Sequence, residues 1–354
     1  MIMDGFILPY KTKIPLPDKK IQSFIKEIFP NEEISNLSIE ESFVNPVYSF
    51  KMESGKEYIL KINNPYWPSK QEREVFALNF IREKTTIPVP EIIENRIPIQ
   101  KNKLSYLILE KSPGQDFRSL LYSKKLSSDD ILAVTEKCGN YLGQMHTLAF
   151  EYFGDMTQQK PSDETLGFFW GRQFQNWPEC FREFCLNVLH WVDSNSFQKY
   201  RLPLRKKIDY YTSVMPKDET ACFVHSDMQP TNVIIENGDI SAVIDFEWSY
   251  AGSASFDYLL TKAGFYLSSF PSLHPSKMYQ DHSDLTREKF DDAFLKGYQT
   301  TNSKPLLSLP EELSDFIWLL YMIGSWDWSV QSSTKEDVEK YREAIHTLYS
   351  KFKK

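Results

Sequence analysis

The chain has 354 residues, of which 41% are hydrophobic and 25% are charged, the balance of a folded globular protein rather than a disordered one. Its formal net charge of −7 argues against a general nucleic-acid-binding protein, because such proteins present basic surfaces. No segment offers the roughly 18 consecutive apolar residues of a membrane span, and the four cysteines show neither disulfide nor zinc spacing, so we expect a cytoplasmic protein with reduced thiols that contacts no membrane.

Apolar side chains at helical spacing predict two helices in the first third of the chain, over 18–29 and 69–84. Between them, segments rich in β-branched and aromatic residues predict a β-hairpin within 38–62 that turns at Gly55. Two further strands are expected at 91–93 and 104–110. This part of the chain is therefore expected to form a small β-rich lobe.

From about residue 127 onward the periodic segments are mainly helical. Helices are expected over 129–150, 177–196, 287–300 and 311–330. One β-rich segment, residues 221–246, interrupts them. Strands followed by helices predict an α+β fold of two lobes. The expected units are an extension over 1–29, a β-rich lobe over 30–110 and a larger, mainly helical lobe over 111–354.

The β-rich interruption contains the most informative pattern in the chain. An Asn-Gly pair between two short apolar runs predicts a tight two-residue hairpin turn. That turn is expected to place Asn232 opposite Val243, with Asp245 on the same face of the ribbon and diagonal to Asn232. Asp227 lies five residues before Asn232, in the loop that enters the hairpin, so all three polar side chains are expected to face one point.

These residue types suit the transfer of a phosphoryl group. Magnesium takes oxygen ligands and few carboxylates, so we expect Asn232 and Asp245 to bind Mg²⁺. A further carboxylate is needed to orient the acceptor hydroxyl and to accept its proton, and we assign this role of catalytic base to Asp227. His225 is expected to brace the loop by hydrogen bonds rather than to transfer a proton.

Two segments, His-x-Asp-x(4)-Asn at 225–232 and Ile-Asp-Phe-Glu-Trp at 244–248, resemble the aminoglycoside phosphotransferase and choline kinase superfamily. The resemblance implies a bilobed, protein-kinase-like fold in which the first Asp is the base and the Asn and second Asp bind magnesium. Glu247 stands where protein kinases carry the Gly of Asp-Phe-Gly. The resemblance also implies that Asp257 steadies the catalytic loop, and that the β-rich lobe binds the nucleotide while the helical lobe binds the acceptor.

A phosphate-binding lysine is then expected in the first lobe. Lys61, near the end of the strand Tyr-Ile-Leu-Lys-Ile, resembles the family's Val-Leu-Lys strand, which implies contact with the α- and β-phosphates of ATP or GTP. Glu74 shares a helical stripe with Leu78 and Ile81, and an acid on an apolar stripe needs a partner, so we expect it to pair with Lys61. Glu72 is the competing partner.

The loop over the phosphates departs from the kinase pattern, because no Gly-x-Gly-x-x-Gly segment occurs. Residues 42–48 resemble the family's Gly-Gly-x-x-Asn-x-x-Tyr segment at Asn45 and Tyr48 but lack its glycines, so nucleotide preference stays open. The resemblance implies that backbone groups at Leu109 and Lys111 meet the adenine edge.

The acceptor is expected to contact the helical lobe. Trp326 and Asp327 belong to a Ser-Trp-Asp-Trp segment that suits an ammonium group, and Glu247 and Trp248 follow the metal-binding Asp closely. Aromatic residues at helical spacing are more often core, so this cage is the weaker reading. An aminoglycoside or other amino sugar, a choline-like alcohol, and a metabolic hydroxyl such as a sugar or amino alcohol all fit.

Two alternatives stay open. A catalytically silent kinase-fold protein would bind a nucleotide or a partner without transferring phosphate, but such proteins usually lose the base, the lysine or a metal ligand. Asp227, Asn232, Asp245 and Lys61 are all present here. A protein kinase is disfavoured by the missing Gly-rich loop and the missing Asp-Phe-Gly.

Overall fold

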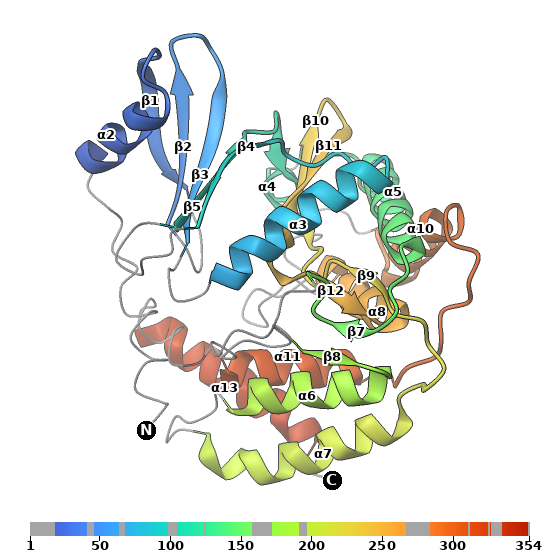
Figure 1. Cartoon of the computed structure of the whole chain (residues 1–354). Helices are drawn as coiled ribbons and strands as arrows, with labels where there is room; N and C mark the ends of the chain where they lie inside the picture. The colour runs from blue at the N-terminus through green and yellow to red at the C-terminus, as the bar shows by residue number, and fades with distance from the viewer. Residues whose placement is uncertain are drawn as a thin grey trace.

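An antiparallel sheet forms the first lobe of the computed structural model (Figure 1). Its strands are ordered β1-β2-β3-β5-β4, with bounds β1 (Ile34–Glu40), β2 (Val47–Met52), β3 (Glu57–Asn63), β4 (Ile92–Arg96) and β5 (Ser105–Glu110). The hairpin predicted at Gly55 joins β2 to β3, and this glycine has a φ of 89° that only glycine adopts readily. The structure describes residues 18–40, 46–63, 68–97, 105–123, 125–157, 172–190, 197–266, 284–310, 312–324, 326 and 335–352.

Both faces of this sheet are covered, as alternate residues of β5 show. Tyr106 and Ile108 lie in one apolar cluster, together with side chains of helix α2 (Asp18–Ile28). Leu107 belongs to the second, larger cluster, which includes side chains of α3 (Pro68–Lys84). Because successive side chains of a strand point to opposite faces, the sheet lies between α2 and α3. The two predicted helices of this lobe are confirmed.

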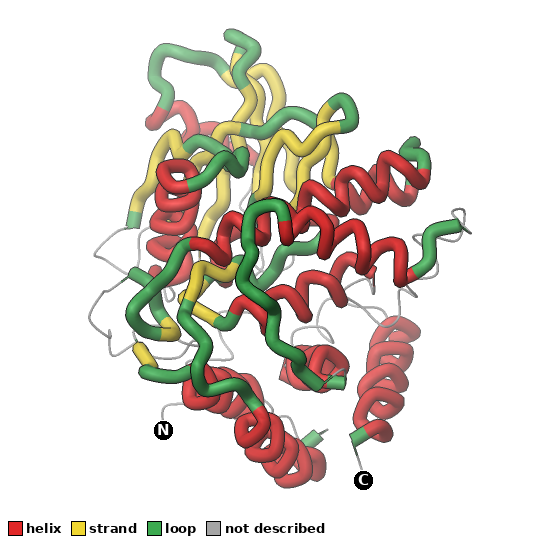
Figure 2. The backbone as a smooth tube through the Cα atoms, turned by 90° about the vertical axis from the view of Figure 1, so that its right-hand side faces the viewer, coloured by secondary structure: helices red, strands yellow, loops and turns green. Residues whose placement is uncertain are grey.

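The second lobe is mainly helical, and Figure 2 shows most of the strands at one end of the molecule, with helices and a few short strands below them. Its helices are α4 (Phe117–Tyr122), α5 (Ser128–Thr147), α6 (Trp177–His190), α7 (Arg201–Val214), α8 (Ala254–Tyr266), α10 (Arg287–Gln299), α11 (Leu313–Gly324) and α13 (Lys335–Lys351). The four helices predicted from periodicity are present, with ends shifted by a few residues. The α+β, two-lobed fold class is confirmed.

Helices α5 and α10 cross at close range because glycines meet at the contact. A Cβ atom added to Gly297 would lie 1.7 Å from the backbone oxygen of Glu136, and one added to Gly139 would lie 2.0 Å from that of Phe294. Ser127 caps α5, and its side chain and that of Asp130 satisfy each other's backbone N–H groups. These features fix the packing of α5 against α10.

The predicted hairpin consists of β10 (Val233–Glu236) and β11 (Asp239–Val243), and Asn237 and Gly238 both have positive φ, as the tight turn requires. The pairing of Glu236 with Asp239 is confirmed. The predicted placement of Asn232 opposite Val243 is wrong by one residue. The ladder shifts between Ile234 and Ile235, so Val233 lies opposite Val243.

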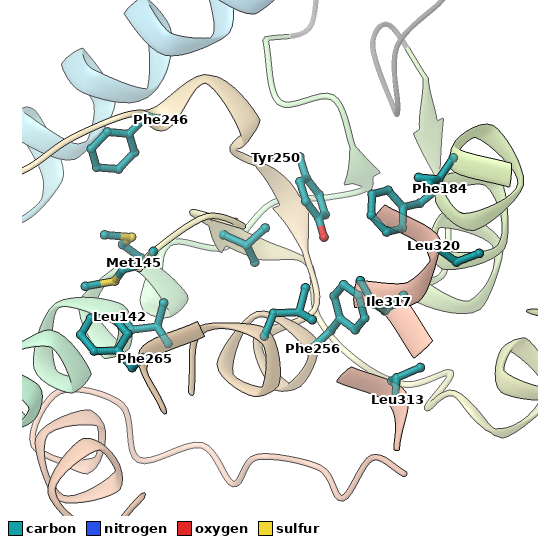
Figure 3. Packing of buried hydrophobic residues seen from close by; sticks show 14 of the residues in the cluster. Leu142, Met145, Phe184, Phe246, Tyr250, Phe256, Phe265, Leu313, Ile317 and Leu320 are labelled. Carbon is teal, nitrogen blue, oxygen red and sulfur yellow. The ribbon is translucent and has the colours of Figure 1, made fainter. Parts of the chain in front are cut away.

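The second lobe also contains a small four-stranded sheet, in the order β8-β7-β12-β9. Its strands are β7 (Phe153–Gly154), β8 (Gln173–Phe174), β9 (Cys222–Val224) and β12 (Tyr250–Gly252), and the hairpin itself pairs with β6 (Gln115–Asp116). The apolar core runs beneath, and Figure 3 shows Phe246, Met145, Tyr250 and Phe256 among its side chains. Among the described residues, no helix combines the length and the apolar character needed to cross a membrane.

Candidate active site

The loop after β9 is held from behind by one carboxylate of α8. The two oxygens of Asp257 accept hydrogen bonds from the backbone N–H groups of His225, at 3.1 Å, and Ser226, at 2.9 Å. Ser226 has a φ of 68°, a left-handed conformation that a non-glycine residue rarely adopts. Asp257 also lies 3.1 Å from Nε2 of buried His146. These contacts are those that the predicted supporting role of Asp257 requires.

His225 joins this loop to the segment that carries Asp245. Its Nε2 lies 3.1 Å from the backbone oxygen of Ile244, and its Nδ1 accepts from the backbone N–H of Asp227 at 3.3 Å. Burial lowers the pKa of His225, and the charge of Asp257 opposes this shift. A buried neutral imidazole that bridges two backbone segments suits a bracing residue rather than a proton carrier.

Asp227 follows Ser226 in this loop, and two amide side chains donate hydrogen bonds to its carboxylate. One of its oxygens accepts from Nε2 of Gln229 at 2.9 Å, and the other accepts from Nδ2 of Asn232 at 3.1 Å. The same Asn232 nitrogen also donates to the backbone oxygen of Asp227 at 2.8 Å. Burial raises the pKa of Asp227 well above its usual range, and the charge of Asp245 acts in the same direction. Such a carboxylate binds a proton more readily than an ordinary aspartate.

Lys61 meets two carboxylates from distant parts of the chain. Its Nζ lies 2.7 Å and 2.8 Å from the oxygens of Glu74 and 2.9 Å from Oδ1 of Asp245. Burial alone lowers the pKa of Lys61, but the charges of Asp245 and Glu74 outweigh it and raise that pKa, so the ammonium stays charged. Asp245 lies two residues after the end of β11 and has a φ of 67°, a left-handed backbone conformation that a non-glycine residue rarely adopts.

The donor set around this point consists of oxygens, which Mg²⁺ prefers. Glu74, Asp245 and Glu247 each offer a carboxylate oxygen, and these atoms lie within 4.8 Å of one another. Asn232 uses its amide nitrogen on Asp227, and its backbone oxygen accepts from Ile244 beside Asp245 at 3.0 Å. Glu74 and Glu247 are paired with Lys61 and Lys70. The assignment of Asn232 and Asp245 as magnesium ligands stays a prediction that their oxygen donors suit.

Of the other predicted nucleotide contacts, Leu109 is buried in β5, where it pairs with Ile59. The backbone N–H of Lys111 donates to the oxygen of Glu57 at 3.0 Å. The structure thus places both residues at the passage from the sheet to the second lobe. Asn45 lies outside the described residues, and the roles of all three stay predictions.

The predicted acceptor residues are spread over two regions. Glu247 is 5% exposed, and its carboxylate pairs with Nζ of Lys70 at 2.5 Å, which also lies 4.2 Å from the ring centre of Trp248. Trp326 is 4% exposed and packs against Phe197, with their ring centres 4.9 Å apart. Asp327 lies outside the described residues. No contact among these decides the acceptor, so their roles stay predictions.

Residues that the sequence analysis missed surround the same point. Lys70 and Arg73 of α3 are 3% and 2% exposed and reach the segment of Glu247. Tyr321 of α11 forms a side-chain hydrogen bond with Ser226. Burial raises the pKa of the Tyr321 hydroxyl, and the charge of Asp227 acts in the same direction. The signal for Lys70 was its spacing, because it lies four residues before Glu74 on the same helical stripe.

Comparisons with known proteins agree with this geometry. A family model described as a phosphotransferase enzyme family matches residues 37–302. The chain belongs to this family. The match confirms the predicted superfamily and the predicted class of enzyme.

Solved structures of similar fold cover nearly the whole chain. A thermostable mutant of the aminoglycoside phosphotransferase APH(4)-Ia, in a ternary complex with ADP and hygromycin B, has a TM-score of 0.56 at 16% identity and covers 94% of this chain and 98% of that chain. The ternary complex of streptomycin, ATP and APH(2")-IIa has a TM-score of 0.55 at 15% identity, covering 93% and 96%. These likenesses confirm the predicted kinase-like fold.

A curated relative is named for a different kinase activity. Homoserine kinase of Zymomonas mobilis is 26% identical over 132 residues, which is 35% of this chain and 36% of that protein. The match thus spans about a third of the length of the relative.

Proposed function

We propose that the chain transfers the γ-phosphate of ATP, or of GTP, to a hydroxyl group of a small, amine-bearing molecule. One observation carries this proposal: a buried lysine from the sheet, Lys61, bonds to the carboxylates of Glu74 and Asp245, beside a loop in which Asp227 is held by Asn232. Phosphoryl transfer is mostly positioning and charge stabilisation, and these groups supply both.

Each residue has a distinct part in this mechanism. Lys61 stays protonated and presents a positive charge to the α- and β-phosphates, while Glu74 fixes the direction of its ammonium. Asn232 and Asp245 would hold Mg²⁺, which when bound neutralises charge on the phosphates. Asp227 accepts the proton of the acceptor hydroxyl, and its raised pKa favours this step.

The division of labour follows the two lobes. We assign nucleotide binding to residues 30–110, with backbone groups at Leu109 and Lys111 meeting the adenine edge and Asn45 near the phosphates. Acceptor binding belongs to residues 111–354. Trp326 packs against Phe197 and Glu247 pairs with Lys70, so we expect other side chains of this lobe to make the main acceptor contacts.

The acceptor class rests on what the relatives are named for. Aminoglycosides, which the two solved relatives are named for, and homoserine, the substrate named for the curated relative, share an amino group and a hydroxyl group. Ethanolamine presents the same pair of groups, and choline presents a hydroxyl group beside a quaternary ammonium. A panel of these compounds therefore covers the proposal.

The test is transfer of labelled γ-phosphate from ATP or GTP, with Mg²⁺, to homoserine, choline, ethanolamine and a set of aminoglycosides. We expect one class to be labelled by the wild type and not by Asp227→Asn. Asp218→Asn, at an exposed aspartate, is the matched control and should retain full transfer. Nucleotide binding without transfer to any compound would favour the silent kinase-fold protein, and no binding of either nucleotide would refute the proposal.

A further inference from the structure

Helix α3 buries polar side chains over its first two turns and apolar side chains afterwards. Lys70, Gln71, Arg73 and Glu74 are all less than a twentieth exposed, with values of 3%, 0%, 2% and 1%. Charged groups are buried only when partners compensate them. The partners of these four side chains come from different elements, so the helix connects parts of the chain that are far apart in sequence.

Through Gln71 and Glu74, α3 is attached to the sheet of the first lobe. The amide of Gln71 accepts hydrogen bonds from Asn63, at 2.8 Å, and Ser105, at 2.7 Å, and donates to the backbone oxygen of Tyr106 at 2.6 Å. Glu74 adds its two bonds to Lys61. These hydrogen bonds therefore hold the first turns of α3 against the sheet.

The same face of α3 is also attached to the segment that follows Asp245. Nζ of Lys70 bonds to Oε1 of Glu247 at 2.5 Å, and Nη1 of Arg73 donates to the backbone oxygen of Glu247 at 3.3 Å. Nη2 of Arg73 lies 3.9 Å from Oδ2 of Asp155, after β7. Lys70 and Arg73 thus both contact residues of the second lobe, close to the point where Lys61 meets Asp245.

The charge balance gives Lys70 a specific task. The carboxylates of Glu74, Asp245 and Glu247 lie within 4.8 Å of one another, and three negative charges there would repel a triphosphate. Lys70 neutralises Glu247, so Lys61 faces two carboxylates, those of Glu74 and Asp245, rather than three. Without Lys70, the buried Glu247 would attract Lys61.

We propose that Lys70, assisted by Arg73, is a positioning residue that ties α3 to segment 245–248 and keeps the charge of Glu247 away from the phosphate site. The inference rests on the proposed function. It assigns Glu247 to an ion pair between the lobes, in place of the acceptor contact expected from sequence. The tie sets Glu74 and Asp245 together around Lys61, so it acts on nucleotide binding and turnover without touching the reacting atoms.

The test compares Lys70→Met, Lys70→Arg, Glu247→Gln and the double variant Lys70→Met/Glu247→Gln. Lys84→Met is the matched control, because Lys84 lies on the same helix, is exposed and pairs with exposed Glu83. Hydrogen–deuterium exchange over 68–84 without nucleotide reports the tie, and calorimetry with Mg²⁺ and ADP reports the charge balance. We expect faster exchange and affinity weakened roughly tenfold in Lys70→Met, with neither change in Lys84→Met. Turnover should fall by about 100-fold, since misplacement of this order has that effect.

Lys70→Arg should restore most of the affinity, and Glu247→Gln added to Lys70→Met should recover part of it, because the excess negative charge is gone. The inference would be overturned if Lys70→Met showed the same exchange and affinity as Lys84→Met. It would also be overturned if the effects of Lys70→Met and Glu247→Gln were strictly additive in the double variant. If Lys70→Met does not fold, Lys70→Arg and Glu247→Gln still decide through the same two measurements. A wild type that binds no nucleotide would refute the proposed function, while exchange over 68–84 would still test the tie.

Discussion

Replacing Lys61 by methionine tests the buried ion pair that the site depends on. The side chain of Glu74 is 1% exposed, so the variant leaves a buried carboxylate without its cation, a change that typically costs about 3–5 kcal/mol. Protonation of Glu74 limits this cost, because neutralising a carboxyl with an ordinary pKa of 4.5 costs about 1.4 kcal/mol for each pH unit above that value. Burial already raises the pKa of Glu74 to about 7 in the wild type, so relative to the wild type this limit grows by about 1.4 kcal/mol for each pH unit above about 7.

The sign of the pH dependence follows from proton binding. Burial raises the pKa of Glu74 to about 7 in the wild type, and loss of the opposing charge of Lys61 raises it further in Lys61→Met. Above about pH 7 the folded variant therefore holds a proton that the folded wild type releases, so its stability relative to the wild type falls as pH rises. With an unfolding entropy of about 2.1 cal/mol/K per residue, the drop in Tm is expected to be about 2 °C larger at pH 8 than at pH 6. Differential scanning calorimetry at both pH values measures it.

Two controls sharpen this experiment. Lys51→Met removes a lysine whose pair with Glu57 is exposed, and it should cost at most about 1 kcal/mol at either pH. Adding Glu74→Gln to Lys61→Met removes the buried carboxyl, and the pH dependence should disappear with it. An equal loss of stability at pH 6 and pH 8 in Lys61→Met would refute the reasoning, because it would locate the cost in packing rather than in the charge of Glu74.

Three further predictions concern the loop, the metal ligands and the helical frame. Asp227→Asn should lower turnover by about 10²–10⁴-fold and raise Tm, because it removes a charge whose burial is unfavourable; a lower Tm in thermal melts would contradict this. Asp245→Ala should abolish the Mg²⁺-dependent part of the stabilisation by ADP, about 2.7 kcal/mol at 100 times the Kd, in melts with and without Mg²⁺. Gly297→Ala, whose Cβ would collide with a backbone oxygen of α5, should cost about 1–3 kcal/mol in urea unfolding, whereas Gly264→Ala, with its nearest neighbour at 3.7 Å, should be neutral or stabilising.

The sequence predicted those features that short segments determine. The Asn-Gly turn located the hairpin and its closing pair, Glu236 and Asp239, because only that turn type suits positive φ at two successive residues. Lys61 and Glu74 were predicted as partners because a buried acid on an apolar stripe needs a cation, and the structure brings them to 2.7 Å. In both cases the physical requirement lies within a few residues of the chain.

The register beyond the turn could not be predicted in the same way. The shift between Ile234 and Ile235 accompanies pairing of the hairpin with β6, whose two residues carry no periodic pattern of their own. Ser241, opposite the shift, donates to the backbone oxygen of Pro113 at 2.6 Å. A contact over 128 residues of chain thus accompanies the shift, and no local signal contains it.

The contact between α3 and Glu247 shows what a local sequence pattern can predict and what it cannot. Lys70, Glu74, Leu78 and Ile81 follow one another along a single stripe of the helix, so burial of Glu74 implies burial of Lys70 one turn earlier. A buried lysine requires an anion, and Glu74 is already engaged by Lys61. The stripe therefore requires a second carboxylate from elsewhere, 177 residues away in the chain. Sequence reasoning can reach the need for that partner, whereas its identity as Glu247 depends on how the two lobes meet.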